Sequence, residues 1–266
     1  MFDASTLWSP LLRLREQAPL VQCITNFVAM DVTANVLLAA GASPAMVHAV
    51  EEAAEFVGLG GTLSINIGTP SPPWVAGMES AAYAAHRRGT PWVLDPVAVG
   101  ATSYRTDIVG NLLSFVPTVI RGNAGEIMAM AGDQDVEIKG VDSTRPSADA
   151  RGAALGLAQK TAAVVVVTGA QDIVTDGNRL IALANGHPLM TKVTALGCAL
   201  TGLIAAFLAV ADDPLLAAAS AVAYFGVCGE LAADGADGPG SLRTRLLDRL
   251  YSLDQGEFAS RLRLAP

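Results

Sequence analysis

The stretch LVQCITNFVAMDVTANVLLAAGASPAMVHA, residues 20–49, decides the fold class of this chain. It begins with an apolar run at 20–24 and ends with another at 44–49, and each run predicts a buried strand. Between them, apolar residues recur at helical spacing and Gly41 supplies a stop, so the pattern predicts a helix over 31–40. A strand, a helix and a second strand in this order are typical of a parallel sheet with right-handed crossovers.

The same alternation of strands and helices continues along most of the chain. A hairpin turning at 176–178 interrupts it, and we expect that hairpin at one edge of the sheet. From Gly197 onward the pattern is almost wholly helical. We therefore predict an α/β fold, with a mostly parallel central sheet flanked by helices on both faces, and a single domain over 1–266. The other expected strands are 63–67, 92–95, 118–122 and 163–168, and the other expected helices are 51–57, 73–88, 107–115, 124–131, 148–161, 198–210, 215–233 and 241–250.

The composition argues against several kinds of partner. Lys and Arg number 17 against 25 Asp and Glu, giving a formal net charge of -8 without any basic run, so we expect no nucleic-acid partner. The longest apolar stretches, 162–167 and 199–211, are shorter than the roughly 20 residues that a bilayer span needs. The first 17 residues do not resemble a signal peptide. We therefore expect a cytoplasmic protein without a membrane partner.

The cysteines and histidines are few and scattered. Cys23, Cys198 and Cys228 are odd in number and far apart, which argues against a disulfide framework or a thiolate zinc site. His48 and His86 fit capping or surface roles better than catalytic ones. A structural metal cage is therefore not expected.

Charged residues follow two of the predicted strands, at the edge where open α/β sheets bind their ligands. Asp95 ends one strand, Arg121 ends the next, and Glu126 follows shortly after. Because Mg²⁺ is usually held by one or two carboxylates together with water and phosphates, Asp95 and Glu126 are candidate magnesium ligands. Arg121 is a candidate phosphate ligand, since a guanidinium binds phosphate oxygens through two donors.

Each of these charged residues also has a plainer interpretation. Asp95 precedes a proline and suits a turn or a helix cap. Glu126 suits the first turn of a helix, where an acid complements the helix dipole. Arg121 suits a surface ion pair. The sequence alone leaves these alternatives open.

The pair Gly197 and Cys198 stands immediately before a long apolar run. A helix that begins there points free N–H groups at the site, and such a helix start attracts anions and the charge of a phosphoryl group in transfer. The same field is expected to lower the pKa of Cys198 below its usual value of about 8.5, so that its thiolate accepts a proton from a substrate hydroxyl. The alternative is a small apolar filler, the role that better suits Cys23 and Cys228.

Six segments, in the order given at the end of this paragraph, together resemble one known family. Each is weak evidence by itself, but their order and spacing are specific, and they extend over about residues 10 to 260. On these segments the chain resembles the hydroxyethylthiazole kinase family of the ribokinase-like superfamily. The segments are QCITNFVAMDVTANVLLAAGASPAMVHAVEEAAEF, LSINIGT, WVLDPVAVGAT, VIRGNAGEI, VVVVTGAQDIVTDG and VTALGCALTGLIAAF.

The resemblance implies a reaction, an assembly and a set of site residues. The family transfers the γ-phosphoryl group of ATP, with Mg²⁺, to the primary alcohol of 4-methyl-5-(2-hydroxyethyl)thiazole in thiamine biosynthesis or salvage. It has a ribokinase-like fold and forms a homotrimer with the thiazole sites between subunits. By resemblance, Asn26, Met46 and the backbone of Ala195 contact the thiazole, Arg121, Thr168 and Asn123 bind ATP, Asp95 and Glu126 organise magnesium, Gly197 belongs to the anion hole, and Cys198 stands where most ribokinase relatives have an aspartate base.

The chain departs from the family pattern beside the candidate base. The family usually has Val-Thr-Gly-(Thr/Ala)-Gly-Cys, whereas here Thr194 is followed by Ala195 and Leu196. If the backbone has a positive φ there, alanine pays a steric penalty of about 1 kcal/mol or somewhat more. Ala98 likewise replaces a common family glycine.

Two alternatives to the kinase remain at this point. One is a nucleotide-dependent dehydratase of the same superfamily, against which Cys198 argues because that family keeps an aspartate after its glycines. The other is a non-catalytic oligomer that binds the thiazole but no longer transfers phosphate.

Overall fold

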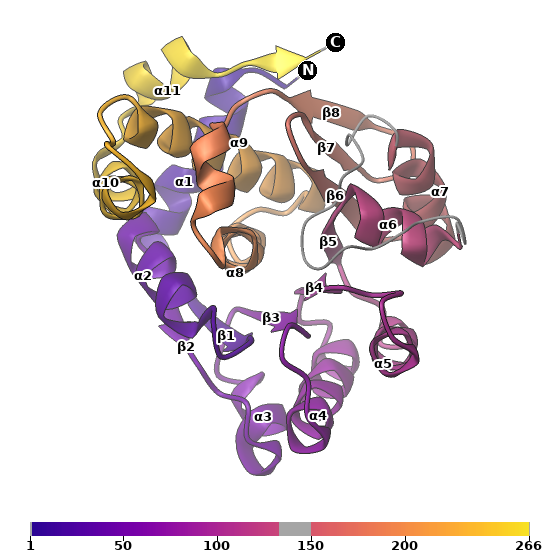
Figure 1. Ribbon diagram of the computed structural model, residues 1–266. Helices are drawn as coiled ribbons and strands as arrows, with labels where there is room; N and C mark the ends of the chain where they lie inside the picture. Colours follow the sequence, from indigo (N-terminus) through magenta and orange to yellow (C-terminus); the bar gives the residue numbers. More distant parts are fainter. Residues whose placement is uncertain (1, 133–149, 266) are drawn as a thin grey trace.

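The structure is a computed structural model that describes residues 2–132 and 150–265, and it is built on one sheet (Figure 1). The strand order is β2-β1-β3-β4-β5-β6-β7-β8-β9. All pairs from β2 to β6 are parallel, and the pairs from β6 to β9 are antiparallel, which confirms the mostly parallel sheet. The strands are β1 Leu20–Ile24, β2 Ser43–Ala45, β3 Thr62–Asn66, β4 Trp92–Asp95, β5 Val119–Asn123, β6 Val164–Thr168, β7 Asp172–Thr175, β8 Leu180–Leu183 and β9 Leu264–Ala265.

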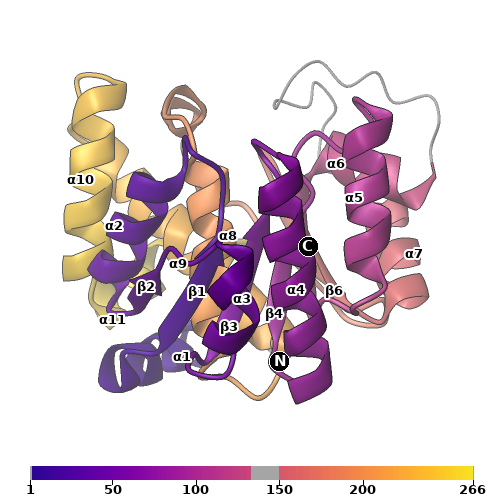
Figure 2. The same ribbon diagram turned by 90° about the horizontal axis from the view of Figure 1, so that it is seen from below.

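Helices cover both faces of the sheet, as predicted (Figures 1 and 2). One face is covered by α1 Ala4–Gln17, α2 Met30–Ala40, α8 Leu196–Leu208, α9 Pro214–Ala233, α10 Pro239–Ser252 and α11 Gln255–Arg261. The other face is covered by α3 Val50–Phe56, α4 Pro72–Arg88, α5 Ser103–Leu113, α6 Ala124–Ala131 and α7 Arg151–Thr161.

The first four residues of strand β6 are all valine, because both faces of this strand are covered. Val164 and Val166 pack into the core under α8 and α9, while Val165 and Val167 pack under α6 and α7. Because successive side chains of a strand point to opposite faces and both faces are covered, every position has to be apolar. Polar residues also occur inside two neighbouring strands, Gln22 in β1 and Ser64 in β3, while Asn66 and Asp95 stand at the carboxyl ends of β3 and β4.

Several expected elements match closely, and others differ. The helix predicted at 124–131 is α6, but the strand predicted at 44–49 is wrong in length, since β2 ends at Ala45. An edge strand pairs on one side only, which leaves fewer hydrogen bonds to extend it. The hairpin β7–β8 is not the sheet edge, because β9 pairs outside it. The sequence reading missed α1, α11 and β9, and residues 148 and 149 of the helix predicted at 148–161 lie outside the described residues.

Helix α9 is long and apolar enough to cross a bilayer by length and composition alone. In the structure, 94% of its apolar window is buried against other elements of the chain. It packs beside α8, α10 and α1, and this central position accounts for its being apolar on every side.

Candidate active site

The carboxyl ends of five neighbouring strands bring the candidate residues to one edge of the sheet. The register of β3 and β4 places Asn66 opposite Asp95, and that of β5 and β6 places Asn123 opposite Thr168. Asn26 follows the end of β1 by two residues. The parallel topology thus collects residues that are up to 142 positions apart in the sequence from Asn26 to Thr168.

Asp95 is fully buried at the centre of this edge. Its Oδ2 accepts hydrogen bonds from Asn66 Nδ2 and Thr201 Oγ1, each at 2.7 Å, and lies 3.5 Å from Arg121 Nη1. Its Oδ1 is buried and meets no hydrogen-bond donor in the described part of the chain. Burial raises the pKa of Asp95, opposed by the charge of Arg121 and by the hydrogen bonds. The side chain therefore belongs to a polar cluster rather than to a turn at Pro96.

The carboxylate of Glu126, in the first turn of α6, accepts hydrogen bonds from two backbone N–H groups. Its Oε2 accepts from Asn123 N at 2.8 Å, and Asn123 Oδ1 accepts from Glu126 N at 2.9 Å, which makes a capping box. Its Oε1 accepts from Ala98 N at 2.9 Å. Burial, and then the neighbouring charge of Asp95, raises the pKa of Glu126 to about 7. The helix-capping interpretation of Glu126 is thus what the structure displays, and the magnesium interpretation stays a prediction.

Arg121 lies between the strand ends and the start of α8. Its Nη2 donates to Thr168 Oγ1 at 2.5 Å, and its side chain is 11% exposed, so the ion pair with Asp95 is buried rather than on the surface. A Cβ atom added to Gly197 would lie 2.8 Å from both Nη1 and Nη2 of Arg121. The guanidinium therefore approaches the helix start as closely as a glycine permits.

Cys198 is the third residue of α8 and is joined to Asp95 through two amides. Asn26 Nδ2 lies 3.4 Å from Cys198 Sγ and donates to Asn66 Oδ1 at 2.7 Å. Asn66 in turn donates to Asp95. These four residues form a continuous polar chain across the strand ends, which we call the amide relay.

The pKa of Cys198 moves in the opposite direction to the one expected from its place in the helix. Burial, and then the charge of Asp95, raises this pKa to about 11, while Arg121 and Asn26 act in the lowering direction. The prediction of a lowered pKa is therefore wrong, because burial destabilises the thiolate by more than the start of the helix stabilises it. Cys23 and Cys228 are fully buried in apolar surroundings, as a filler role requires.

Two alanines at the mouth of the site have left-handed backbone conformations. Ala195, the N-cap of α8, has φ 66, and Ala98, in the loop after β4, has φ 56. Both stand at positions where the resemblance described above implies a glycine. A positive φ is unfavourable for alanine at both positions.

We predict that Ala195→Gly leaves the free energy of unfolding within about 0.5 kcal/mol, because relief of strain and the greater freedom of the unfolded chain nearly cancel. Ala195→Val should lose about 2 kcal/mol, since a β-branched residue tolerates a positive φ poorly. Chemical denaturation of the three proteins measures both differences. A valine variant as stable as the alanine protein would contradict the strain.

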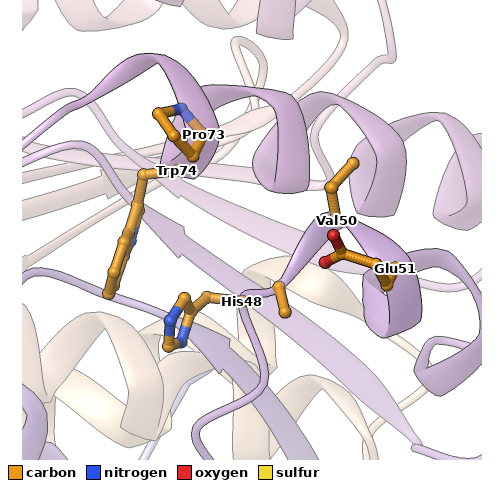
Figure 3. A pocket seen from close by; sticks show the side chains of 6 residues that line it. His48, Val50, Glu51, Pro73 and Trp74 are labelled. Atoms are coloured by element: carbon orange, nitrogen blue, oxygen red, sulfur yellow. The ribbon is translucent and has the colours of Figure 1, made fainter.

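A hollow lies at the starts of α3 and α4 and is lined by His48, Ala49, Val50, Glu51, Pro73 and Trp74 (Figure 3). Its volume is about 280 Å³, and the ring of His48 stacks on that of Trp74 with 3.8 Å between centroids. Trp74 Nε1 donates to the carbonyl of Thr25 at 3.0 Å, which ties this wall to the amide relay. His48 thus has an aromatic partner instead of the capping role expected from the sequence. Met46 lies two residues before His48 in the chain. Its half-buried side chain packs against the core cluster that includes residues of α2 and α8.

Asn66 and Thr201 were not among the candidates drawn from the sequence. Asn66 is the polar residue at the carboxyl end of β3, and Thr201 lies three residues after Cys198 on the same face of α8. Both signals were present in the sequence. Only the strand order, however, shows that the two side chains meet at Asp95.

Comparison with known proteins agrees with this architecture. The Hydroxyethylthiazole kinase family matches residues 11–256. A curated hydroxyethylthiazole kinase of Cereibacter sphaeroides is 59% identical over 240 residues, covering 90% of this chain and 91% of that protein. A solved hydroxyethylthiazole kinase protein from Pyrococcus horikoshii OT3 is 40% identical, with a TM-score of 0.91 over 98% of each chain. Bacillus subtilis pyridoxal kinase, at 16% identity and a TM-score of 0.60, covering 79% of this chain and 91% of its own, shares the fold. The chain therefore belongs to the hydroxyethylthiazole kinase family.

Proposed function

We propose that this protein transfers the γ-phosphoryl group of ATP to the primary alcohol of 4-methyl-5-(2-hydroxyethyl)thiazole, a step of thiamine biosynthesis or salvage. Family membership over most of the chain supports the activity. The observation that carries it is the contact of Cys198, in the first turn of α8, with an amide relay that ends at the buried Asp95. A helix start, a cation and a carboxylate at one sheet edge suit a reaction that depends on positioning and charge neutralisation.

The proposed roles divide the site into two sides. On the nucleotide side, Arg121, Thr168 and Asn123 bind ATP, and the N–H groups around Gly197 stabilise the charge of the phosphoryl group in transfer. On the acceptor side, Asn26, Met46 and the backbone of Ala195 hold the thiazole. The contact of Asn26 with Cys198 brings the acceptor side next to the start of α8, where Gly197 belongs to the nucleotide side.

The residues present fit a magnesium ion. Buried Asp95 Oδ1 has no protein donor in the described residues, and an oxygen of this kind is a suitable ligand for Mg²⁺. Within 2–132 and 150–265 no group of three or more His, Cys, Asp or Glu side chains could hold a metal ion, so Asp95 and Glu126 would share it with water and the phosphates of ATP. When bound, the ion supplies positive charge beside those phosphates.

Cys198 is proposed to take the proton of the substrate hydroxyl. With its pKa raised to about 11, the thiol is almost entirely protonated near pH 7, and its thiolate is scarce but strongly basic. Phosphoryl transfer passes through a loose transition state in most analyses, so that little activation of the hydroxyl is needed before the bond forms. The Asn26 amide, which faces the sulfur, favours the thiolate once it forms.

We expect kcat of the unmodified protein to rise about 100-fold between pH 7 and 9, tenfold for each pH unit. The active form is the thiolate, whose fraction grows with pH as long as the pH is below the pKa of about 11. Cys198→Ser should lower kcat about tenfold, flatten this pH profile and leave the KM for ATP within twofold. Steady-state rates at saturating substrate measure both profiles. An unchanged rate in Cys198→Ser would remove the proton-transfer role.

We also propose a cytoplasmic homotrimer, with each chain a single domain over 1–266. One sheet shared by nine strands of the described chain supports the single domain. Exposed Val50 lines the hollow of Figure 3, and the exposed ring of Phe27 packs on Trp74 beside it, so that the two offer an apolar surface that suits a neighbouring subunit. Native mass spectrometry gives the subunit number directly.

Mass spectrometry of the products tests the activity. The protein is incubated with ATP and the thiazole alcohol, and a phosphorylated thiazole together with ADP supports the kinase. Calorimetry showing tight thiazole binding without any product would favour the non-catalytic oligomer. Conversion of hydrated NADH, in place of thiazole phosphorylation, would favour the dehydratase.

A further inference from the structure

Arg105, in the first turn of α5, binds three backbone carbonyl groups at the edge of the site. Its Nη1 donates to the carbonyls of Ile67 at 2.9 Å and Val97 at 2.8 Å, and its Nη2 donates to that of Gly68 at 2.8 Å. These carbonyls belong to two separate loops, one after β3 and one after β4. A single guanidinium therefore fastens the two loops to each other.

The peptide unit between Val97 and Ala98 is held from both ends by opposite charges. Its carbonyl accepts from Arg105, and its N–H donates to Glu126 Oε1 at 2.9 Å. Ala98 has φ 56, a conformation that costs about 1–3 kcal/mol in a residue other than glycine. The two charged groups thus hold a peptide in an orientation that the backbone alone does not prefer.

The other loop supports the amide relay. The N–H of Gly68 donates to Asn66 Oδ1 at 2.9 Å, and a Cβ added to Gly68 would lie 2.5 Å from Asn26 Nδ2. Moving the backbone around Gly68 would therefore move the Asn26 amide, which faces Cys198. Through its three bonds Arg105 connects the acceptor side of the site to the side of Asp95 and Glu126.

We infer that Arg105 is a positioning residue, which fixes the 97–98 peptide and keeps the loops after β3 and β4 in register for phosphoryl transfer. The inference depends on the proposed kinase activity for its effect on rate. In this role the Arg105 side chain contacts neither the nucleotide nor the acceptor. A misplacement of about 1 Å in such a site lowers the rate about 10²-fold, which sets the size of the effect to be tested.

The first experiment compares Arg105→Gln, Arg105→Lys and the control Arg87→Gln, which changes an exposed arginine on α4. We expect kcat to fall about 100-fold in Arg105→Gln and about tenfold in Arg105→Lys, because an ammonium keeps the charge but not the fork that reaches three carbonyls. The KM for ATP should stay within twofold in both. Circular dichroism checks the fold of each variant. If Arg105→Gln does not fold, the kcat of Arg105→Lys decides the test. A kcat unchanged in the folded variants overturns the inference.

The second experiment adds Ala98→Gly to Arg105→Gln. Glycine adopts a positive φ without steric cost, so the peptide then needs less support, and the loss of kcat caused by Arg105→Gln should become at least threefold smaller than in the alanine background. A purely global loss of stability would give the same loss in both backgrounds. An equal or larger loss in the glycine background therefore overturns the inference.

The third experiment tests whether Arg105 fixes the 97–98 peptide, and it does not depend on the catalysed reaction. Hydrogen exchange of the Ala98 amide should be at least tenfold faster in Arg105→Gln than in Arg87→Gln, because that N–H loses its fixed orientation toward Glu126. Unchanged exchange overturns the inference even if the rate falls. If the unmodified protein does not phosphorylate the thiazole, the proposed function fails, and the exchange at Ala98 still decides whether Arg105 fixes the peptide.

Discussion

Asp95→Asn is expected to lower kcat about 10³-fold, the largest effect of any substitution considered. The carboxylate pairs with Arg121, accepts from Asn66 and Thr201, and presents a buried oxygen that suits a magnesium ion. An amide has nearly the same shape but neither the charge nor a second acceptor oxygen. Loss of one preorganised electrostatic group in a water-poor site costs about 10²–10³ in rate, and here the amide relay is disturbed as well.

The stability of Asp95→Asn should separate a chemical role from a structural one. Because the amide leaves the buried Arg121 guanidinium without its charge partner, we expect Asp95→Asn to lose about 3–5 kcal/mol in the free energy of unfolding, while the protein stays folded at 25 °C, where the rates are compared. Steady-state kinetics and thermal unfolding measure the two effects. The matched control is Asp107→Asn, on the exposed side of α5, which should leave both unchanged. A kcat of Asp95→Asn within tenfold of the unmodified protein would contradict the role of this carboxylate.

Gly197→Ala is expected to reduce kcat/KM for ATP about 100-fold. The added methyl group would lie 2.8 Å from both terminal nitrogens of Arg121, so the guanidinium has to move by about an ångström. That movement lengthens the bond to Thr168 and the approach to Asp95, which together place Arg121 on the proposed nucleotide side. Initial rates over a range of ATP concentrations measure the effect.

A matched glycine elsewhere distinguishes crowding from a general effect of alanine. Gly156 lies in α7, and a Cβ added there meets nothing within 4 Å. Gly156→Ala should keep full activity and gain about 0.5–1 kcal/mol in the free energy of unfolding, because alanine is the better helix former. If Gly197→Ala also retained full activity, the close approach of Arg121 to α8 would not be required for the reaction.

The sequence predicted those parts of the fold whose pattern is local. The run 92–95 is β4 as predicted, and the helix expected at 31–40 begins only one residue earlier, at Met30. Where pairing partners decide the outcome, the sequence did less well. The run 44–49 is apolar enough for a strand of six residues, but its place at the edge of the sheet leaves only Ser43–Ala45 paired.

In the site, the sequence indicated the residues better than their surroundings. Asp95 and Arg121 were predicted as site residues because each ends a predicted strand, at the edge where open α/β sheets bind ligands. The structure places them in one buried ion pair. The pKa of Cys198 could not be predicted, because its direction depends on depth below the surface, which opposes the helix field. Arg105 left no signal in the sequence, since its partners are backbone carbonyls and any residue type supplies one.

The buried pair of Arg121 and Asp95 has a consequence for how a nucleotide arrives. The guanidinium is already neutralised before any phosphate is present, and it is also bonded to Thr168. An incoming triphosphate therefore exchanges one anionic partner for another instead of meeting a bare cation. Because the pair of Arg121 and Asp95 is buried, added salt weakens it less than it would weaken an ion pair on the surface.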